Sequence, residues 1–177
     1  MRLFSNLLIT LVGLAIGLVV TGFFLPQYQV VERQILIEAE PADIFPHVAS
    51  LQAFAEWSPW ADFDPDMQVT YSGPVTGIGN AMEWTSEHPN VGNGRQEIVE
   101  VIENELVLTA LDFGDMGTAD AWWRLEPESE TVTRVTWGLN ANMGQGPVGR
   151  WFGLFMDGMV GPDYERGLTR LQNSVEE

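Results

Sequence analysis

The sequence contains no cysteine and no lysine. Without cysteine, the chain cannot form disulfides, zinc–thiolate sites or a cysteine nucleophile. Without lysine, it cannot form a Schiff base through a side-chain amine. The chemistry open to this protein is therefore that of carboxylates, arginines, hydroxyls, amides, histidines and aromatic rings.

Basic residues are scarce as a whole. Eight arginines stand against 25 acidic residues, which gives a net charge of −17. All 25 acidic residues lie at or beyond Glu32 and one arginine is Arg2, so the chain after its N-terminal segment has seven basic and 25 acidic residues, a net charge of −18. Such a domain repels phosphate groups, which argues against a nucleic-acid partner and against electrostatic adhesion to anionic lipids.

Histidine is also rare. His47 and His88 are the only two, and their separation matches no known metal-ligand spacing. The run Asp62–Asp66 begins like a calcium loop, but the positions that require glycine and glutamate hold Met67 and Gly73. We therefore predict neither a metal site nor a cofactor.

The N-terminal segment is apolar and without charge. No charged residue occurs between Arg2 and Glu32. As a helix, the 23 residues from Leu3 to Leu25 would be about 35 Å long, enough to cross a hydrocarbon layer of about 30 Å. A cleaved signal peptide is the alternative, but the apolar stretch is longer than usual and no A-x-A site follows it. We predict a transmembrane anchor over residues 1–26.

The orientation of that anchor depends on few charges. Arg2 on the short side favours a domain outside the cytoplasm, whereas Arg33 flanks the other end. The prediction is a single-pass membrane protein whose soluble domain is extracytoplasmic.

The remaining residues, 27–177, have the composition of one folded domain, since 45% of the chain is hydrophobic. Periodicity predicts one strand, two short helices, six antiparallel strands and a long terminal helix kinked at Gly161–Pro162, which is an α+β order. The predicted strands cover 30–39, 67–71, 81–85, 95–103, 106–113, 118–126 and 131–139, and the predicted helices start at Pro41, cover Leu51–Trp57 and cover Val148–Val175.

Alternation within the last strand pair assigns its side chains to two faces. Trp123 and Trp137 are expected to face inward together with the small residues Ala119 and Ala121. Trp122 is then expected to face outward, and the sequence offers no reason for a tryptophan there.

Several short strings resemble a known family. They are Trp57-Ser58-Pro59-Trp60, Asp64-Pro65-Asp66-Met67, Tyr71-Ser72-Gly73-Pro74, Gly77-Ile78-Gly79 with Trp84, and the stretch 154–161 with Gly167-Leu168. In this order they resemble the polyketide-cyclase-like branch of the START-like (SRPBCC) superfamily, over residues 30–176. The resemblance implies a helix-grip fold, a curved antiparallel sheet of about seven strands wrapped around a long C-terminal helix, with an apolar cavity between them. It does not imply an activity, since members include lipid carriers, hormone binders, aromatase/cyclases and oxygenase subunits.

The aromatic and methionine side chains near this predicted cavity are the candidate binding site. Aromatic faces suit flat or acyl ligands, and methionine adapts to varied apolar partners. Core packing is the competing interpretation. The predicted ligand-binding residues are Trp60, Trp84, Phe113, Trp123, Trp137, Phe152, Phe155, Met156 and Met159.

Three functions are consistent with these residues. The first is a membrane-anchored binder of a hydrophobic small molecule, lipid-like or aromatic. The second is a cyclase or dehydratase that uses a buried carboxylate as base, for which Glu83, Glu100 and Asp112 are candidates, with Arg95 or Arg124 to steady an anion. The third is a membrane-tethered scaffold whose cavity is filled by side chains. The lack of a visible nucleophile–base pair favours the binder over the enzyme.

Overall fold

Seven antiparallel strands form one sheet in the order β1-β7-β6-β5-β4-β3-β2. The computed structural model describes residues 2–88 and 91–176. The strands are β1 (Tyr28–Ile37), β2 (Gln68–Ser72), β3 (Ala81–Thr85), β4 (Gly94–Ile102), β5 (Leu106–Asp112), β6 (Thr118–Pro127) and β7 (Thr133–Asn142). Each predicted strand is confirmed, with ends shifted by at most three residues. β1, the first strand, pairs with β7, the last strand, so strands from the two ends of the domain sequence are neighbours at one edge of the sheet.

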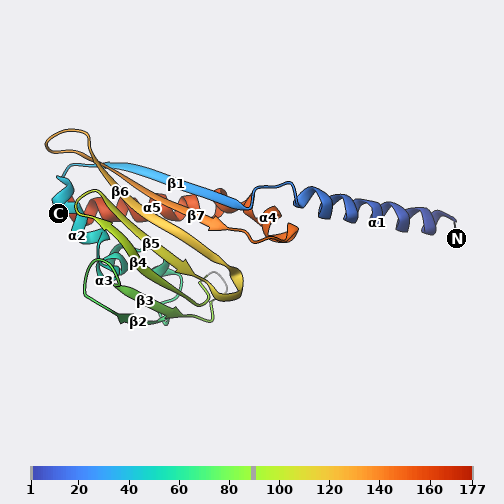
Figure 1. The fold of residues 1–177 in the computed structure, drawn as a ribbon, viewed down its shortest axis with the longest axis horizontal. Coiled ribbons are helices and arrows are strands. Elements are labelled where there is room, and N and C mark those ends of the chain that lie inside the picture. The colour runs from blue at the N-terminus through green and yellow to red at the C-terminus, as the bar shows by residue number, and fades with distance from the viewer. Residues whose placement is uncertain (1, 89–90, 177) are drawn as a thin grey trace.

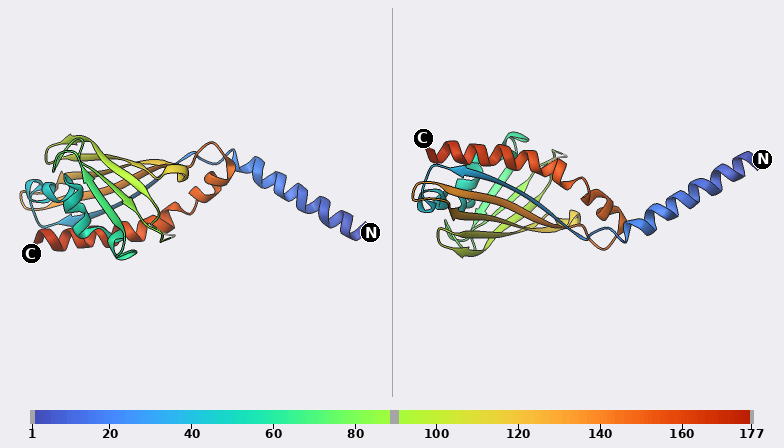
Figure 2. Two further views of the ribbon diagram at one scale, coloured as in Figure 1. Left: turned by 90° about the horizontal axis from the view of Figure 1, so that it is seen from below. Right: turned by 90° about the horizontal axis from the view of Figure 1, so that it is seen from above.

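Helices cover the inner face and one end of this sheet (Figures 1 and 2). The long helix α5 packs along β1, and the short helices α2 and α3 lie at the end of the sheet where α5 terminates. The helix α1 projects from the opposite end. The helices are α1 (Arg2–Gly22), α2 (Pro41–Val48), α3 (Leu51–Trp57), α4 (Pro147–Gly153) and α5 (Met156–Glu176), with 3-10 turns η1 (Pro59–Asp62) and η2 (Gly114–Met116).

The C-terminal helix is divided at a different place from the one predicted. The break lies at Leu154–Phe155, between α4 and α5, whereas Pro162 lies inside α5. Proline removes one backbone hydrogen bond, and a helix of 21 residues tolerates that loss near its start while its remaining bonds persist. The predicted kink at Gly161–Pro162 was therefore placed too far along the chain.

The N-terminal helix is shorter than predicted. It ends at Gly22, and the amides of Phe23, Phe24 and Leu25 then bond to carbonyls three residues back, which closes a tight turn before Pro26. Across the residues that the structure describes, no helix combines the length and the apolar content needed to cross a membrane. The transmembrane span predicted for residues 1–26 is therefore not supported.

Side chains alternate across the sheet as the sequence predicts. Trp123 and Trp137 are buried on the inner face, together with Ala119 and Ala121. Trp122 faces outward and lies across Gly138 of the neighbouring strand, where an added Cβ would come within 2.1 Å of the indole. The missing side chain of Gly138 thus provides the flat surface that accommodates this tryptophan.

Candidate functional site

Six aromatic side chains meet between the sheet and the helices. The Tyr164 ring of α5 stacks on Trp137 of β7, with centroids 3.9 Å apart and planes inclined by 10°. Trp123, which lies opposite Trp137 on the neighbouring strand β6, also stacks on it. The ring centroids are 5.8 Å apart and the planes are inclined by 29°. We call this set the aromatic cluster; its members are Phe54, Trp57, Trp60, Trp123, Trp137 and Tyr164.

The local sequence explains why α5 can approach the sheet so closely. Gly167 lies over the Trp137 indole, and an added Cβ there would be 2.6 Å from the ring. The absent side chain lets the helix backbone rest on the tryptophan, and Tyr164, one turn earlier, then stacks on the same ring. Any larger residue at position 167 would separate α5 from β7.

One hydrogen-bond donor of the aromatic cluster has no acceptor. The Trp123 side chain is fully buried and its Nε1 has no partner within the described residues. By contrast, the Trp57 indole donates to the carbonyl of His47 at 3.1 Å. Because buried polar groups are nearly always paired, the Trp123 donor calls for an explanation. Tyr164 is 2% exposed, and burial raises the pKa of its hydroxyl.

A separate pair of aromatic side chains, outside the aromatic cluster, lies beside β4. Trp84 of β3 contacts Phe113 edge to face, with centroids 5.9 Å apart, and its ring lies over Gly94. Phe113 and Met156 are only partly buried, and both pack against the core. Trp60 is likewise the partly buried member of the aromatic cluster. These residues border the core on its accessible side.

The structure thus divides the predicted binding residues into four groups. Trp60, Trp123 and Trp137 lie together in the aromatic cluster, Trp84 and Phe113 form the separate pair, and Met156 packs against the core as a partly buried side chain. The remaining three do not face the interior: Phe152, Phe155 and Met159 are 51%, 65% and 53% exposed.

Sequence reasoning missed three members of the cluster as site residues. Phe54 and Trp57 belong to α3, and Tyr164 belongs to the apolar stripe of α5. The spacing of Tyr164, Leu168 and Leu171 was the available signal, because it placed Tyr164 on the buried face of the helix.

The candidate acid and base residues are not in the interior. Glu83, Glu100 and Asp112 are all exposed, and Glu83 and Glu97 form ion pairs with Arg95. Among the described residues, the buried polar side chains are Ser50, Ser58, Asn80, Gln96, Thr109 and Thr133, which include no carboxylate. A mechanism that relies on a buried carboxylate base therefore has no residue to carry it in this part of the chain.

The acidic loop after α3 makes an ion pair and a hydrogen bond with other parts of the chain. Asp62 forms an ion pair with Arg170 of α5, which lowers the pKa of the Asp62 carboxyl, and Asp64 accepts a hydrogen bond from Ser86. Over residues 2–88 and 91–176, no three potential metal-ligating side chains lie close enough together to hold an ion.

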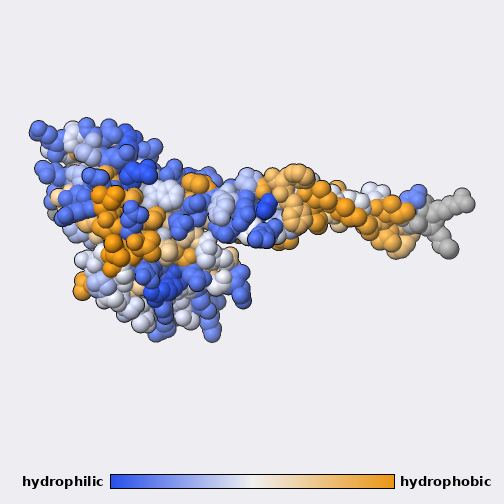
Figure 3. All heavy atoms as spheres, in the orientation of Figure 1, coloured by the Kyte–Doolittle hydropathy of each residue, from blue (hydrophilic) through white to orange (hydrophobic). Residues whose placement is uncertain are grey.

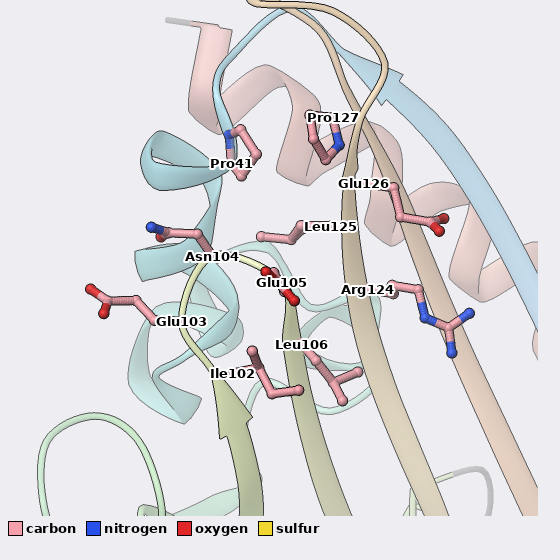
Figure 4. A pocket seen from close by; sticks show the side chains of 10 residues that line it. All are labelled: Pro41, Ile102, Glu103, Asn104, Glu105, Leu106, Arg124, Leu125, Glu126 and Pro127. Atoms are coloured by element: carbon pink, nitrogen blue, oxygen red, sulfur yellow. The ribbon is translucent and has the colours of Figure 1, made fainter.

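An open pocket lies outside the aromatic cluster (Figure 4). It has a volume of about 750 Å³ and is open to solvent, where β6 extends past the turn between β4 and β5. Leu125 is buried at its base, whereas Arg124 points away from the other lining residues. Glu103, Glu105 and Glu126 surround it, so this hollow has neither the apolar enclosure nor the charge that an anionic or lipid-like ligand requires.

Arg33 of β1 forms ion pairs with two carboxylates near the start of α5. Its Nε donates to Glu165 at 2.7 Å and its Nη1 to Asp157 at 2.8 Å. Gly161 allows this, because an added Cβ would lie 2.0 Å from the guanidinium. The hydrogen bonds from Arg33 lower the pKa of the Asp157 carboxyl.

This ion pair leads to a prediction about pH. Because the folded pKa of Asp157 lies below its unfolded value, its stabilising effect is present above the unfolded pKa of about 4 and is lost as the pH falls through the folded pKa. Asp157→Asn should therefore lower the urea midpoint at pH 7, by a small amount because the pair is exposed, and have a smaller effect near pH 2. Asp66→Asn, which removes an unpaired exposed carboxylate, is the control. An equal effect of Asp157→Asn at both pH values would contradict the prediction.

The curved seven-stranded sheet, the long helix across its inner face and the apolar interior between them define a helix-grip domain. The family described as "Polyketide cyclase / dehydrase and lipid transport" matches residues 28–176. The chain belongs to this family, and the superfamily predicted from the sequence is confirmed. No curated protein matches the chain.

Solved structures show the same fold at low sequence identity. Truncated norcoclaurine synthase from Thalictrum flavum is 14% identical, with a TM-score of 0.63 over 85% of this chain and 94% of that one. The Zhui aromatase/cyclase from Streptomyces sp. R1128 is 12% identical, with a TM-score of 0.57 over 84% and 94% of the two chains. Norcoclaurine synthase has also been solved with dopamine and hydroxybenzaldehyde, at 13% identity, a TM-score of 0.59 and coverage of 84% and 86%. At these identities the likeness extends to the fold only.

Proposed function

We propose that this domain binds a neutral hydrophobic small molecule next to the aromatic cluster, and that it does so without catalysis. The observation that carries the proposal is the buried donor Trp123 Nε1, which has no acceptor among the described residues. A bound molecule with an oxygen acceptor would satisfy it, and Tyr164, whose ring stacks on the same Trp137 as Trp123, would offer its hydroxyl as a second donor. The partly buried Trp60 forms part of the cluster surface, so its displacement would admit such a molecule.

The charges near the interior favour a neutral ligand. Arg33 is the arginine of β1 on the inner face, and its guanidinium is already paired with Asp157 and Glu165. Arg95 and Arg170 are likewise paired with carboxylates. A fatty-acid anion would therefore find no free cation among these three arginines, whereas a ketone, ester or ether would meet the Trp123 donor.

Family membership and related structures agree with this proposal. The family description includes lipid transport, and a structure of norcoclaurine synthase holds dopamine and hydroxybenzaldehyde. Both are descriptions of other proteins, and they support a hydrophobic ligand here as a class rather than as a compound.

Mutation of Tyr164 tests the role of the hydroxyl. Tyr164→Phe should weaken the binding of 6-propionyl-2-dimethylaminonaphthalene, a neutral fluorescent ketone, about two- to tenfold, because one hydrogen bond contributes about 0.5–1.5 kcal/mol. Binding of diphenylhexatriene, which has no oxygen, should stay the same. Tyr71→Phe, at an exposed tyrosine, is the matched control. Equal affinity of Tyr164→Phe and the unmodified protein for the ketone would contradict this assignment.

The scaffold is the second candidate, and the close packing of the aromatic cluster favours it. Trp57, Trp123 and Trp137 are each no more than 2% exposed, so these rings fill much of the space that a ligand would need. Native mass spectrometry of the full chain purified from its own host distinguishes the two functions. A co-purifying hydrophobic molecule near one per chain would support the binder, and an empty protein that also ignores both probes would support the scaffold.

We propose in addition that α1 attaches the domain to a membrane. Large apolar side chains are exposed around this helix, and no charge lies between Arg2 and Glu32 (Figure 3). Attachment would raise the local concentration of a sparingly soluble ligand. The location outside the cytoplasm stays a prediction from Arg2. Retention of the protein in the membrane fraction after carbonate extraction is the expected result, and its release would count against attachment.

A further inference from the structure

A second apolar surface adjoins the root of α1. Val148 and Phe152 are four residues apart and share one side of α4, and Phe155 lies in the break between α4 and α5. Their exposed fractions are 80%, 51% and 65%. Phe23 and Phe24, in the turn after α1, are 53% and 83% exposed. We call these five residues the apolar collar.

The collar and α1 are held together by specific contacts. Arg150 of α4 donates from Nη1 to the carbonyls of Phe23 and Leu25, at 2.7 and 3.1 Å, and Trp151 Nε1 donates to the carbonyl of Leu18 at 3.0 Å. Gly22 permits this approach, because an added Cβ would be 2.6 Å from Pro147. The helix therefore has a defined position relative to α4, and anything that surrounds α1 also meets the collar.

Charge is sparse in the segment that joins β7 to α5. The sequence between Arg134 and Asp157 contains one charged residue, Arg150, whereas the whole chain has 33 charged residues. The Arg150 guanidinium lies against the carbonyls at the C-terminal end of α1, where the helix dipole is negative, so its charge is partly neutralised. The collar is therefore an uncharged surface on a protein with a net charge of −17.

The distribution of apolar side chains favours lipid over protein as the partner. A protein would cover one side of α1, whereas large exposed apolar residues occur at almost every helical angle. They are Phe4, Leu7, Leu8, Ile9, Leu11, Val12, Leu14, Ile16, Leu18, Val19 and Val20. Aromatic residues at the root of such a helix, here Trp151 and Tyr28 beside the collar, are typical of the level of lipid headgroups.

We infer that the apolar collar rests on the surface of an uncharged lipid bilayer and sets the orientation of the domain on it. This inference depends on the membrane attachment proposed above. Zwitterionic lipid is the fitting surface, because the acidic domain would be repelled by anionic headgroups. The collar also accounts for Phe152 and Phe155, which were predicted to line a ligand cavity but are exposed.

The absence of cysteine makes a site-specific test possible in the full chain. Single cysteines would be introduced as Val148→Cys and Phe155→Cys in the collar, Leu14→Cys in α1, and Ser129→Cys in the turn between β6 and β7 at the far end of the domain. Each would be labelled with an environment-sensitive nitrobenzoxadiazole dye and mixed with phosphatidylcholine vesicles that contain spin-labelled quencher lipid.

Quenching of the dye at 14, 148 and 155, but not at 129, is the expected result, with the emission of the collar dyes shifted to the blue. Quenching at position 14 without quenching at either collar position would overturn the collar while leaving membrane attachment intact. No quenching at any position would overturn attachment and the collar together. Two collar positions are used so that misfolding of one variant leaves the other to decide.

Discussion

Replacement of Trp137 by alanine is expected to lower the free energy of unfolding by about 3–5 kcal/mol. The indole is 2% exposed and contacts Trp57, Trp123 and Tyr164, so its removal leaves a cavity that rigid neighbouring rings cannot fill. Domains of this size are stable by only about 5–15 kcal/mol, so the loss would be a large share of the total.

Urea unfolding followed by circular dichroism would measure this loss. Phe155→Ala is the matched control, because it also removes an aromatic ring but from a position that is 65% exposed. That variant should change the free energy by no more than about 0.5 kcal/mol. Similar free energies for the two variants would show that the aromatic cluster is not the centre of the core.

Replacement of Asn80 by leucine is expected to cost about 2–5 kcal/mol. Asn80 is fully buried, and its side chain accepts from the Leu51 amide at 2.7 Å and donates to the Pro74 carbonyl at 2.7 Å. Leucine has a similar size, so the substitution isolates the polar loss. It removes the partner of the buried Leu51 amide and of the Pro74 carbonyl, and an unpaired buried group costs about 1–3 kcal/mol.

The same unfolding experiment tests this second prediction. Asn93→Ala removes one exposed hydrogen bond, to the amide of Ser86, and should have little effect. If Asn80→Leu were as stable as the unmodified protein, the link between the start of α3 and the loop before β3 would not matter to the fold. A loss above 2 kcal/mol would show that one side chain joins these two segments.

Particular residues show how far sequence patterns determine this fold. The alternation of Ala119, Ala121 and Trp123 placed β6 with the correct face inward, because a strand puts every second side chain on the same side. Pro41 marked the start of α2 correctly, since proline is tolerated in a first helical turn. The break between α4 and α5 could not be predicted in this way, because the apolar stripe continues through it.

All nine predicted binding residues were expected to line one cavity, and their binding of a ligand stays a prediction. The structure brings Trp60, Trp123 and Trp137 into contact. Phe152 and Phe155 follow the same spacing as a buried helical stripe, yet they are exposed, because α4 packs against α1 rather than against the sheet. Periodicity reports which side chains share a face and leaves open what covers that face.

The sequence by itself determined the family, the number of strands and their order along the chain, the uncharged N-terminal segment and the exclusion of cysteine and lysine chemistry. Those properties depend on composition and on the spacing of nearby residues. Tertiary structure alone decided that Tyr164 stacks on Trp137, that Gly138 accommodates Trp122 and that Arg33 fastens α5 to β1. The physical reason is that each of these contacts joins residues distant in the chain, whose distance is set by the packing of whole elements rather than by any local pattern.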